Sequence, residues 1–206
     1  MHKIDSINSI SDTYISISEV AIGEYKDKGS KFLAFAFPFT NIENLKKNLD
    51  ETKALHPKAR HFCYAYKVGI SNENFRTNDD GEPSGSAGKP ILNAILSKNL
   101  SDLLIIVVRY FGGTLLGVPG LINAYKSASL EAISNATIVE RIVCEKYTLK
   151  YDFEKTNEVM RIIKEFNLKI INQGYSDNCE TTIEIRLSLI PKVLEKIDEL
   201  RFVEIL

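Results

Sequence analysis

The sequence predicts an α+β protein of two domains, and three observations support this fold class. The chain has 206 residues, of which 44% are hydrophobic and 26% are charged, values typical of a globular chain with one large or two small domains. Patterns typical of strands and of helices follow one another in both halves. The succession of strand and helix patterns changes near Glu140. We therefore place the domain boundary there, between a domain of residues 1–139 and a domain of residues 140–206.

The first domain is expected to combine strands and helices, judged from the period of its apolar residues. Residues 31–39 place apolar side chains on one strand face, and Pro38 marks a strand that is an edge or that ends there. Asn41 suits the cap of a helix, and Pro90 suits the first position of another. Residues 103–109 are apolar up to the arginine, as in a strand covered on both faces. The other elements expected here are strands at 14–19 and 60–68 and a helix after Gly120.

The second domain shows a regular succession of elements. Residues 181–189 alternate between apolar and polar side chains, which predicts a strand with one buried face. The full set is a strand from 143 to 151, a helix from 153 to 166, strands at 168–175 and 181–189, a helix from Pro191 and a closing strand at 202–206. This order, β-α-β-β-α-β, is the ferredoxin-like signature.

Composition limits the class of protein. The formal net charge of −1 excludes a broadly basic nucleic-acid module, so any contact with RNA has to come from a local patch. No apolar run approaches the roughly 18 residues that cross a bilayer, and the polar segment 1–12 lacks the apolar centre of a secretory signal. Three cysteines, Cys63, Cys144 and Cys179, form no close pair, which favours a reducing cytoplasm.

The stretch DDGEPSGSAGKP (79–90) has no bulky apolar side chain. It fails the Walker A pattern, because Pro83 and Pro90 stand where a glycine and a hydroxyl residue are needed. Its small residues let backbone N–H groups face a ligand at a helix N-terminus, where partial positive charge gathers. We therefore hypothesise an anion site, against the alternative of an idle flexible loop. Its members are Ser84, Gly85, Ser86, Gly88 and Lys89.

A second glycine-rich loop, RYFGGTLLGVPGL (109–121), follows the buried strand. Its glycine spacing does not match the dinucleotide fingerprint. Gly112 and Gly113 nevertheless permit a sharp reversal and a close backbone approach, and Arg109 can bind an anion or a carboxylate through two hydrogen bonds. The alternative is that Arg109 pairs with an acid of the first loop and pins it, the candidates being Asp79, Asp80 and Glu82.

His61 and Cys63 fall on one face of the expected strand 60–68. A zinc site needs two more ligands, and the calcium-loop pattern fails beyond Gly81, so we expect no metal and no cofactor. A Cys–His pair, or an oxyanion cradle that serves a small phosphorylated or acyl substrate, would make the chain an enzyme. No nucleophile with an attached base is evident, so we expect no catalytic residue.

In the second domain, an exposed sheet face is expected to carry Lys146, Thr148, Lys150 and Arg186. Sheets that bind RNA present aromatic residues on such a face. None is expected here, which favours a solvated face.

The stretches KGSKF (28–32), ARHFCYAY (59–66), GEPSGSAGKPIL (81–92) and LLIIVVRYFGGTLLG (103–117) together resemble the IMPACT family, which includes bacterial YigZ-type proteins. The resemblance implies a first domain folded like the second domain of a small-subunit ribosomal protein, an α/β sandwich. It also implies a ferredoxin-like second domain similar to domain V of elongation factor G. The sequence departs from the family pattern at Phe62, often a histidine, at Leu115, often a lysine, and at Val118–Pro119, often Thr-Gly.

The resemblance also implies a role. Eukaryotic members restrain a kinase of a translation initiation factor by competing for its activator, and binding to nucleic acid or the ribosome has been suggested for bacterial members. We therefore expect a non-enzymatic cytoplasmic binding or regulatory protein linked to translation, with the ribosome, RNA or a translation-related protein as partner and no membrane. Lys31, Lys89 and Arg109 are the cations left for the anion site, and His61 completes the candidate set. An enzyme and a protein–protein regulator are the alternatives.

Overall fold

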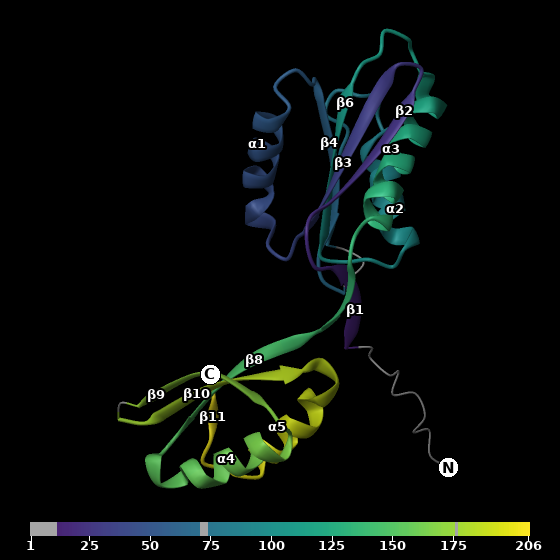
Figure 1. Ribbon diagram of the computed structural model, residues 1–206. Coiled ribbons are helices and arrows are strands. Elements are labelled where there is room, and N and C mark those ends of the chain that lie inside the picture. The colour runs from purple at the N-terminus through teal and green to yellow at the C-terminus, as the bar shows by residue number, and fades with distance from the viewer. Residues whose placement is uncertain (1–11, 71–73, 176) are drawn as a thin grey trace, which may run out of the picture. The chain divides into compact units, whose positions relative to one another are not determined.

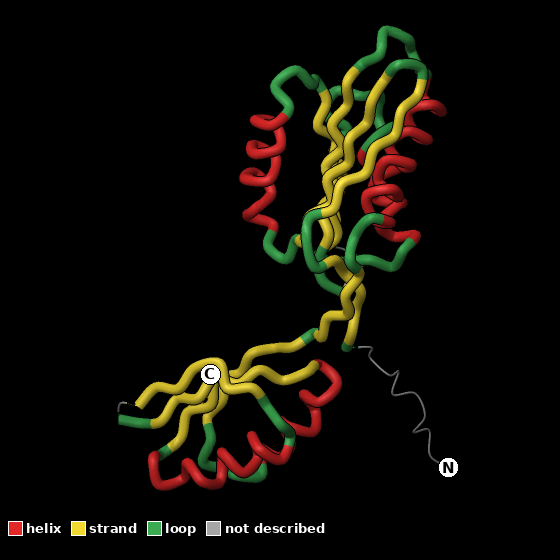
Figure 2. Tube along the Cα trace, viewed as in Figure 1, coloured by secondary structure: helices red, strands yellow, loops and turns green. Residues whose placement is uncertain are grey.

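The computed structural model describes residues 12–70, 74–175 and 177–206, which form two compact units. One unit spans residues 14–141, and the other contains residues 142–206 together with Asp12 and Thr13. Apart from Asp12, the polar segment 1–12, which is expected to lack a secretory signal, lies outside the described residues. Each unit contains both helices and strands, as the sequence predicts (Figures 1 and 2).

Among the helices of the described part of the chain, none combines the length and the apolar character needed to cross a membrane.

The larger unit is an α/β sandwich. Its elements are β1 (Thr13–Ile17), β2 (Ala21–Asp27), β3 (Ser30–Pro38), α1 (Leu45–Leu55), β4 (His61–Lys67), β5 (Phe75–Asn78), α2 (Gly88–Ser97), β6 (Leu103–Tyr110), α3 (Gly117–Ser134) and β7 (Ile138–Ile142). Five strands form an antiparallel sheet in the order β2-β3-β6-β4-β5, and β1 pairs with β7 separately. Helix α1 covers one face of the large sheet, and α2 and α3 cover the other (Figure 1).

Strand β6 lies in the middle of the large sheet, between β3 and β4. Ile105 and Val107 pack into the core on the side of α2 and α3, whereas Leu104 and Ile106 pack on the side of α1. Every residue from Leu103 to Arg109 is buried, because both faces of this strand are covered. The expectation of a doubly covered strand is confirmed.

Several boundaries differ from the expectations. Strands β2, β5 and β7 were not expected. Pro38 ends β3 and does not mark an edge, since β3 pairs with a strand on each side. Helix α2 begins two residues before Pro90, which is tolerated because the first N–H groups of a helix have no partner within it. Asn41 caps the 3-10 turn Ile42–Asn44 that leads directly into α1, since its Oδ1 accepts a hydrogen bond from Glu43 N at 2.9 Å.

The smaller unit has the ferredoxin-like order of elements. These are β8 (Cys144–Tyr151), α4 (Thr156–Glu165), β9 (Lys169–Tyr175), β10 (Cys179–Arg186), α5 (Ile190–Asp198) and β11 (Glu204–Ile205). The strands form an antiparallel sheet in the order β11-β8-β10-β9. One sheet face packs against both helices around Ile183, Ile163 and Val193. This topology confirms the prediction made from the sequence.

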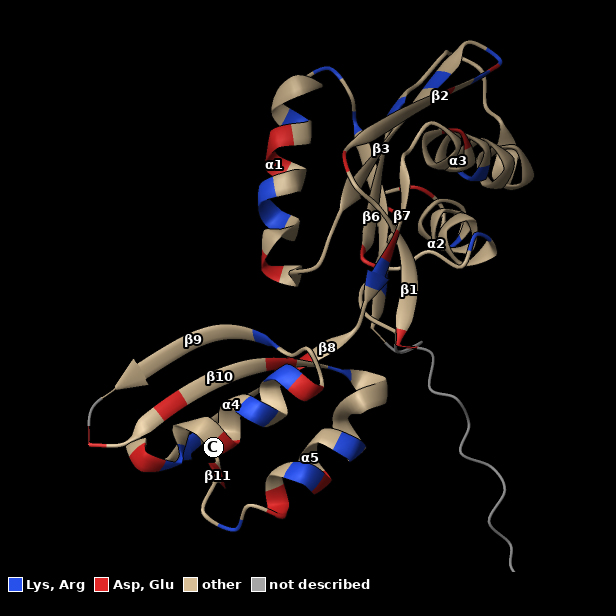
Figure 3. Ribbon diagram, turned by 60° about the horizontal axis from the view of Figure 1, so that its bottom comes forward, with Lys and Arg blue, Asp and Glu red and all other residues tan. Residues whose placement is uncertain are grey.

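The other face of the smaller sheet carries charges of both signs. Lys146 lies opposite Glu184 and Lys150 opposite Glu180 in the register of β8 and β10, and Lys169 Nζ of β9 lies 3.6 Å from a Glu184 carboxylate oxygen. Figure 3 shows a basic position on β9 and acidic positions on β10. Because opposite charges stand side by side across the strands, this face suits solvent more than a polyanion.

Candidate functional site

One end of the large sheet brings together residues that are far apart in the sequence. His61, the first residue of β4, pairs with Arg109 near the end of β6. Lys31, near the start of β3, pairs with Tyr110. The second glycine-rich loop follows β6 directly, and His61 Nδ1 lies 2.9 Å from the backbone oxygen of Asp80 in the first loop. Both loops therefore meet at this end of the sheet.

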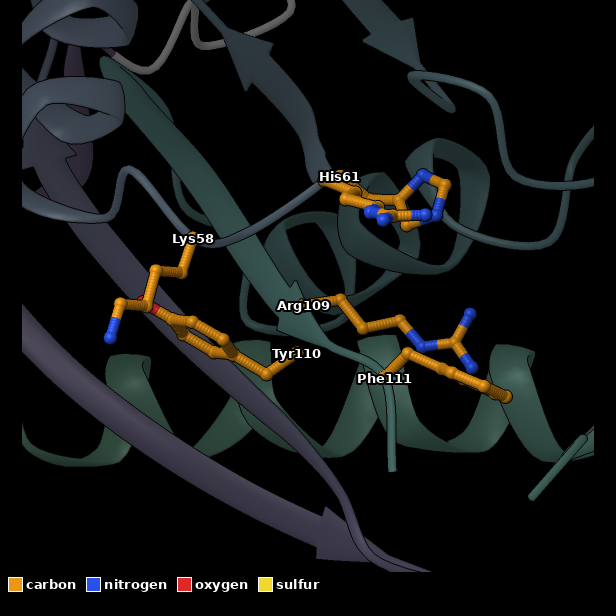
Figure 4. Close-up of a pocket in the computed structure, with 6 residues that line it drawn as sticks. Lys58, His61, Arg109, Tyr110 and Phe111 are labelled. Carbon is orange, nitrogen blue, oxygen red and sulfur yellow. The ribbon is translucent and has the colours of Figure 1, made fainter. Parts of the chain in front are cut away.

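A pocket of about 340 Å³ opens at this end (Figure 4). Two of its lining residues, His61 and Arg109, were singled out from the sequence. The other four were missed, and they are Lys58, Arg60, Tyr110 and Phe111. The described lining residues carry three permanent positive charges and no carboxylate. In a chain with a net charge of −1, this is a local concentration of positive charge.

Arg109 pins the first loop to the end of β6. Its Nη1 donates to Glu82 Oε1 at 2.6 Å, and the two side chains are only 7% and 4% exposed. The hydroxyl of Tyr125 in α3 donates to the same oxygen at 2.8 Å. The loop-pinning alternative is thus confirmed for Glu82. Arg109 keeps unused donors, since its solvent-shielded Nε has no partner among the described residues.

The backbone amides of the first loop are not free to meet a ligand. The Asp79 carboxylate accepts hydrogen bonds from the N–H groups of Gly85, Ala87 and Gly88 at 2.9, 3.0 and 2.8 Å. Burial alone would raise the pKa of Asp79, but the three donors together hold that pKa below its ordinary value. The expectation of open amides is therefore wrong at these positions, because the chain's own carboxylate occupies the N-terminus of α2.

The remaining predicted residues of the first loop lie away from the pocket lining. The Ser86 hydroxyl is buried and donates to the backbone oxygen of Pro83 at 2.6 Å. Ser84 and Lys89 are exposed, but neither lines the pocket. The loop thus positions Glu82 and Asp80, and through them Arg109 and His61.

Gly112 and Gly113 serve the packing of the second loop. A Cβ atom on Gly112 would lie 1.9 Å from the backbone carbon of Gly29, and the amide of Gly112 donates to Ser30 Oγ at 3.1 Å. Gly113 has a φ of +86°, in the left-handed region that favours glycine. The expected close approach and sharp reversal are confirmed, but the amide of Gly112 is already bound.

His61 and Cys63 do not form a catalytic pair. Because a carbonyl only accepts, His61 Nδ1 carries the proton that binds Asp80 O, which leaves Nε2 for another partner. The Cys63 thiol is buried, donates to Asp79 O at 3.0 Å and lies 3.3 Å from the hydroxyl of Tyr125. Burial raises the pKa of this thiol, which disfavours the nucleophilic thiolate.

Lys31 also lies at this end of the sheet. Its Nζ pairs with Glu24 at 2.7 Å, outside the pocket lining.

Within residues 12–70, 74–175 and 177–206, no three His, Cys, Asp or Glu side chains gather as a metal site would require.

Comparison with known proteins decides the family. The family model described as the Impact N-terminal domain matches residues 28–133, a range that includes both loops and the whole pocket. The chain belongs to the IMPACT family. The IMPACT family member YigZ of Escherichia coli (strain K12) is 32% identical over 150 residues, which cover 72% of this chain and 74% of that relative.

Further comparisons agree with this membership. An IMPACT family member of Haemophilus influenzae is 30% identical over 187 residues, which cover 88% of this chain and 87% of the relative. A crystal structure described as that of a hypothetical protein superposes with a TM-score of 0.74 and 25% identity, covering 96% of this chain and 98% of the other. The resemblance seen in the sequence is confirmed, and the fold extends over both units.

Proposed function

We propose that this IMPACT family chain is a non-enzymatic cytoplasmic binding protein linked to translation, which contacts ribosomal or other RNA through the cationic pocket. The observation that carries the proposal is the gathering of the exposed Lys58 and Arg60 at one concave site, beside Arg109, whose charge is paired with Glu82. Phosphate groups are attracted by such a local patch even when the whole chain carries almost no net charge. The link to translation comes from the family.

The pocket assigns new roles to the residues singled out from the sequence. Side chains at the rim make the contacts with phosphate, because the amides of Gly85, Gly88 and Gly112 are already bound. The two loops act as supports that hold Arg109 and His61 in place. Lys31 and Lys89 contribute to the positive field at a distance.

Removal of two rim charges tests this proposal. In the Lys58→Gln/Arg60→Gln variant we expect weaker co-sedimentation with ribosomes and weaker binding to RNA. The slope of log affinity against log salt should fall by about one for each phosphate that is no longer neutralised. The measurement is a salt series by filter binding. Both side chains are exposed, so the fold is expected to stay intact.

A matched control removes the same charge elsewhere. The Lys46→Gln/Lys126→Gln variant changes two exposed lysines of α1 and α3 that do not line the pocket, and it should bind RNA like the parent protein. If both variants lost the same RNA affinity, the loss would be explained by the lower net charge and not by the pocket. Absence of binding to ribosomes and RNA at low salt, where the phosphate contribution is strongest, would refute the proposal.

A protein partner is the second candidate, favoured by apolar side chains in the segment after Phe111. Leu115 is 82% exposed, and Val118 and Ile122 are also exposed. Exposed apolar clusters mark interaction sites on soluble proteins. This alternative predicts that a partner stays bound after nuclease treatment and is lost in the Leu115→Ser/Val118→Ser variant, whereas an RNA-mediated association disappears with the nuclease.

A further inference from the structure

Phe111 is an exposed aromatic ring held at the rim of the pocket. It is 57% exposed and lies between the end of β6 and Gly112, whose amide binds Ser30 Oγ. The Phe111 ring centroid lies 5.6 Å from Arg109 Cζ, and the buried ring of Phe32 lies 5.5 Å from the same carbon. The guanidinium therefore lies within cation–π distance of both rings, and Figure 4 shows the Phe111 side chain alongside that of Arg109.

The other walls of the pocket offer donors and positive charge. Lys58 and Arg60 are exposed and precede β4. His61 Nε2 is left as a hydrogen-bond acceptor, because Nδ1 carries the proton that binds Asp80 O. The acids near this end already have partners, since Glu82 binds Tyr125 and offsets the charge of Arg109, and Asp80 Oδ2 accepts the amide of Phe62 at 2.6 Å. An exposed aromatic ring and two exposed cations thus line one small cavity.

We infer that the pocket holds one unpaired nucleotide of a single-stranded RNA, with its base stacked on Phe111 and the phosphates of the strand bound by Lys58 and Arg60. This inference rests on the proposed function and specifies the form of RNA that the site takes. The pocket volume of about 340 Å³ falls in the range of small-ligand sites. A ring that already contacts the Arg109 guanidinium loses less freedom than an unattached ring when a base stacks on it.

The aromatic platform distinguishes single strands from duplexes. In a duplex, the bases are paired and stacked on one another, so only phosphates and groove edges reach a protein surface. In a single strand, each base has a free face, and stacking on an aromatic side chain adds to the attraction of the phosphates. An acidic peptide would satisfy the cations equally well but would leave the flat platform of Phe111 without a matching ring.

Fluorescence anisotropy on the full-length chain tests the inference. The probes are a labelled ten-nucleotide oligoadenylate and a blunt RNA duplex of the same length, at equal salt. We expect the single strand to bind about tenfold or more tightly than the duplex. Phe111→Ala should lower the affinity for the single strand by about tenfold and leave duplex binding and the salt slope unchanged, whereas Phe111→Trp should retain the affinity.

The control in the same loop is Leu115→Ala, which removes a more exposed apolar side chain and should leave RNA binding unchanged. Equal affinity for both RNA forms, or a Phe111→Ala variant that binds like the parent, would overturn the inference. If the Lys58→Gln/Arg60→Gln substitutions still lower the affinity for both RNA forms, the proposed RNA binding is retained and only the stacking on Phe111 is refuted. Binding of an oligoglutamate peptide but of neither RNA would overturn both. Unchanged urea unfolding of Phe111→Ala shows that the fold is intact.

Discussion

At the scale of single residues, Asp79 decides what the first glycine-rich loop can do. Its carboxylate binds three backbone amides that would otherwise form an anion site. The residue acts as the missing cap of α2, whose Ala87 N-cap position provides no side-chain hydrogen bond. The same loop carries Glu82, the partner of Arg109. The loop is therefore a structural support of the pocket, and the Asp79 carboxylate stabilises its conformation.

Asp79→Asn should destabilise the larger unit at neutral pH. An amide accepts fewer and weaker hydrogen bonds than a carboxylate, so we expect a loss of about 1–2 kcal/mol in the free energy of unfolding. The pKa of Asp79 is lowered in the folded chain, so its contribution is complete above about pH 4, the ordinary range of an aspartate. It is lost as the pH falls through the folded pKa.

Urea unfolding at several pH values measures this difference. The gap between the parent and Asp79→Asn should be constant from pH 7 to about pH 5 and should narrow below about pH 4. Asp50→Asn, at an exposed position of α1, serves as the control with the same chemical change. A gap that stays constant down to pH 2 would show that the charge of Asp79 contributes nothing.

At the scale of elements, the close approach of β2 to α3 depends on Gly23. A Cβ atom at this position would lie 2.2 Å from the backbone nitrogen of Ala132, and a helix backbone cannot yield as a flexible side chain can. We expect Gly23→Ala to lower the free energy of unfolding by about 3 kcal/mol, the upper end of the usual range for overpacking. Thermal and urea unfolding measure the loss.

Gly174→Ala provides the comparison within a strand. No heavy atom lies within 4 Å of a Cβ atom built on Gly174 in β9, so this variant should change stability by less than about 0.5 kcal/mol. If both variants behaved alike, the close packing of β2 against α3 would not limit stability.

The same elements show what the sequence reveals. Strands β6 and β10 were predicted because their apolar patterns are continuous or strictly alternating. Strand β2 was missed because its helix-facing side begins with the small residues Ala21 and Gly23 before Tyr25, while Ile22 is 52% exposed. Small residues let α3 approach closely, but they weaken the period that identifies a strand. Strand β5 is short and largely exposed, so it leaves no pattern.

The candidate site was predicted only in part, for a related reason. His61 and Arg109 could be identified as strand-end residues with polar side chains. Lys58 and Phe111 could be recognised only through the pairing of β4 with β6, because this pairing determines which strand ends meet. The period of apolar residues in the sequence does not encode that pairing. A signal was present in the alternating cations Lys58 and Arg60 before β4. Nothing in the spacing of residues along the chain indicated that the Asp79 carboxylate binds three backbone amides of its own loop.

At the scale of the whole molecule, the two units have separate cores. The larger unit packs its apolar side chains on both faces of one sheet, and the smaller unit packs its own on one face of another. The cationic pocket is built only from residues of the larger unit. The smaller unit is stabilised near its start by Asp12, which binds Arg186 through two hydrogen bonds at 3.0 and 3.1 Å.

Separate cores predict that damage to one unit stays within it. Ile183 is fully buried in the smaller unit, and Ile183→Ala should cost about 2–5 kcal/mol through reduced burial and a residual cavity. Hydrogen exchange followed by mass spectrometry should show faster exchange in residues 142–206 and unchanged protection in residues 14–141. Ile95→Ala, at a fully buried position of α2 in the larger unit, should give the reverse pattern. RNA affinity should survive the first change and fall with the second, and loss of protection in both units from either change would show that they fold as one.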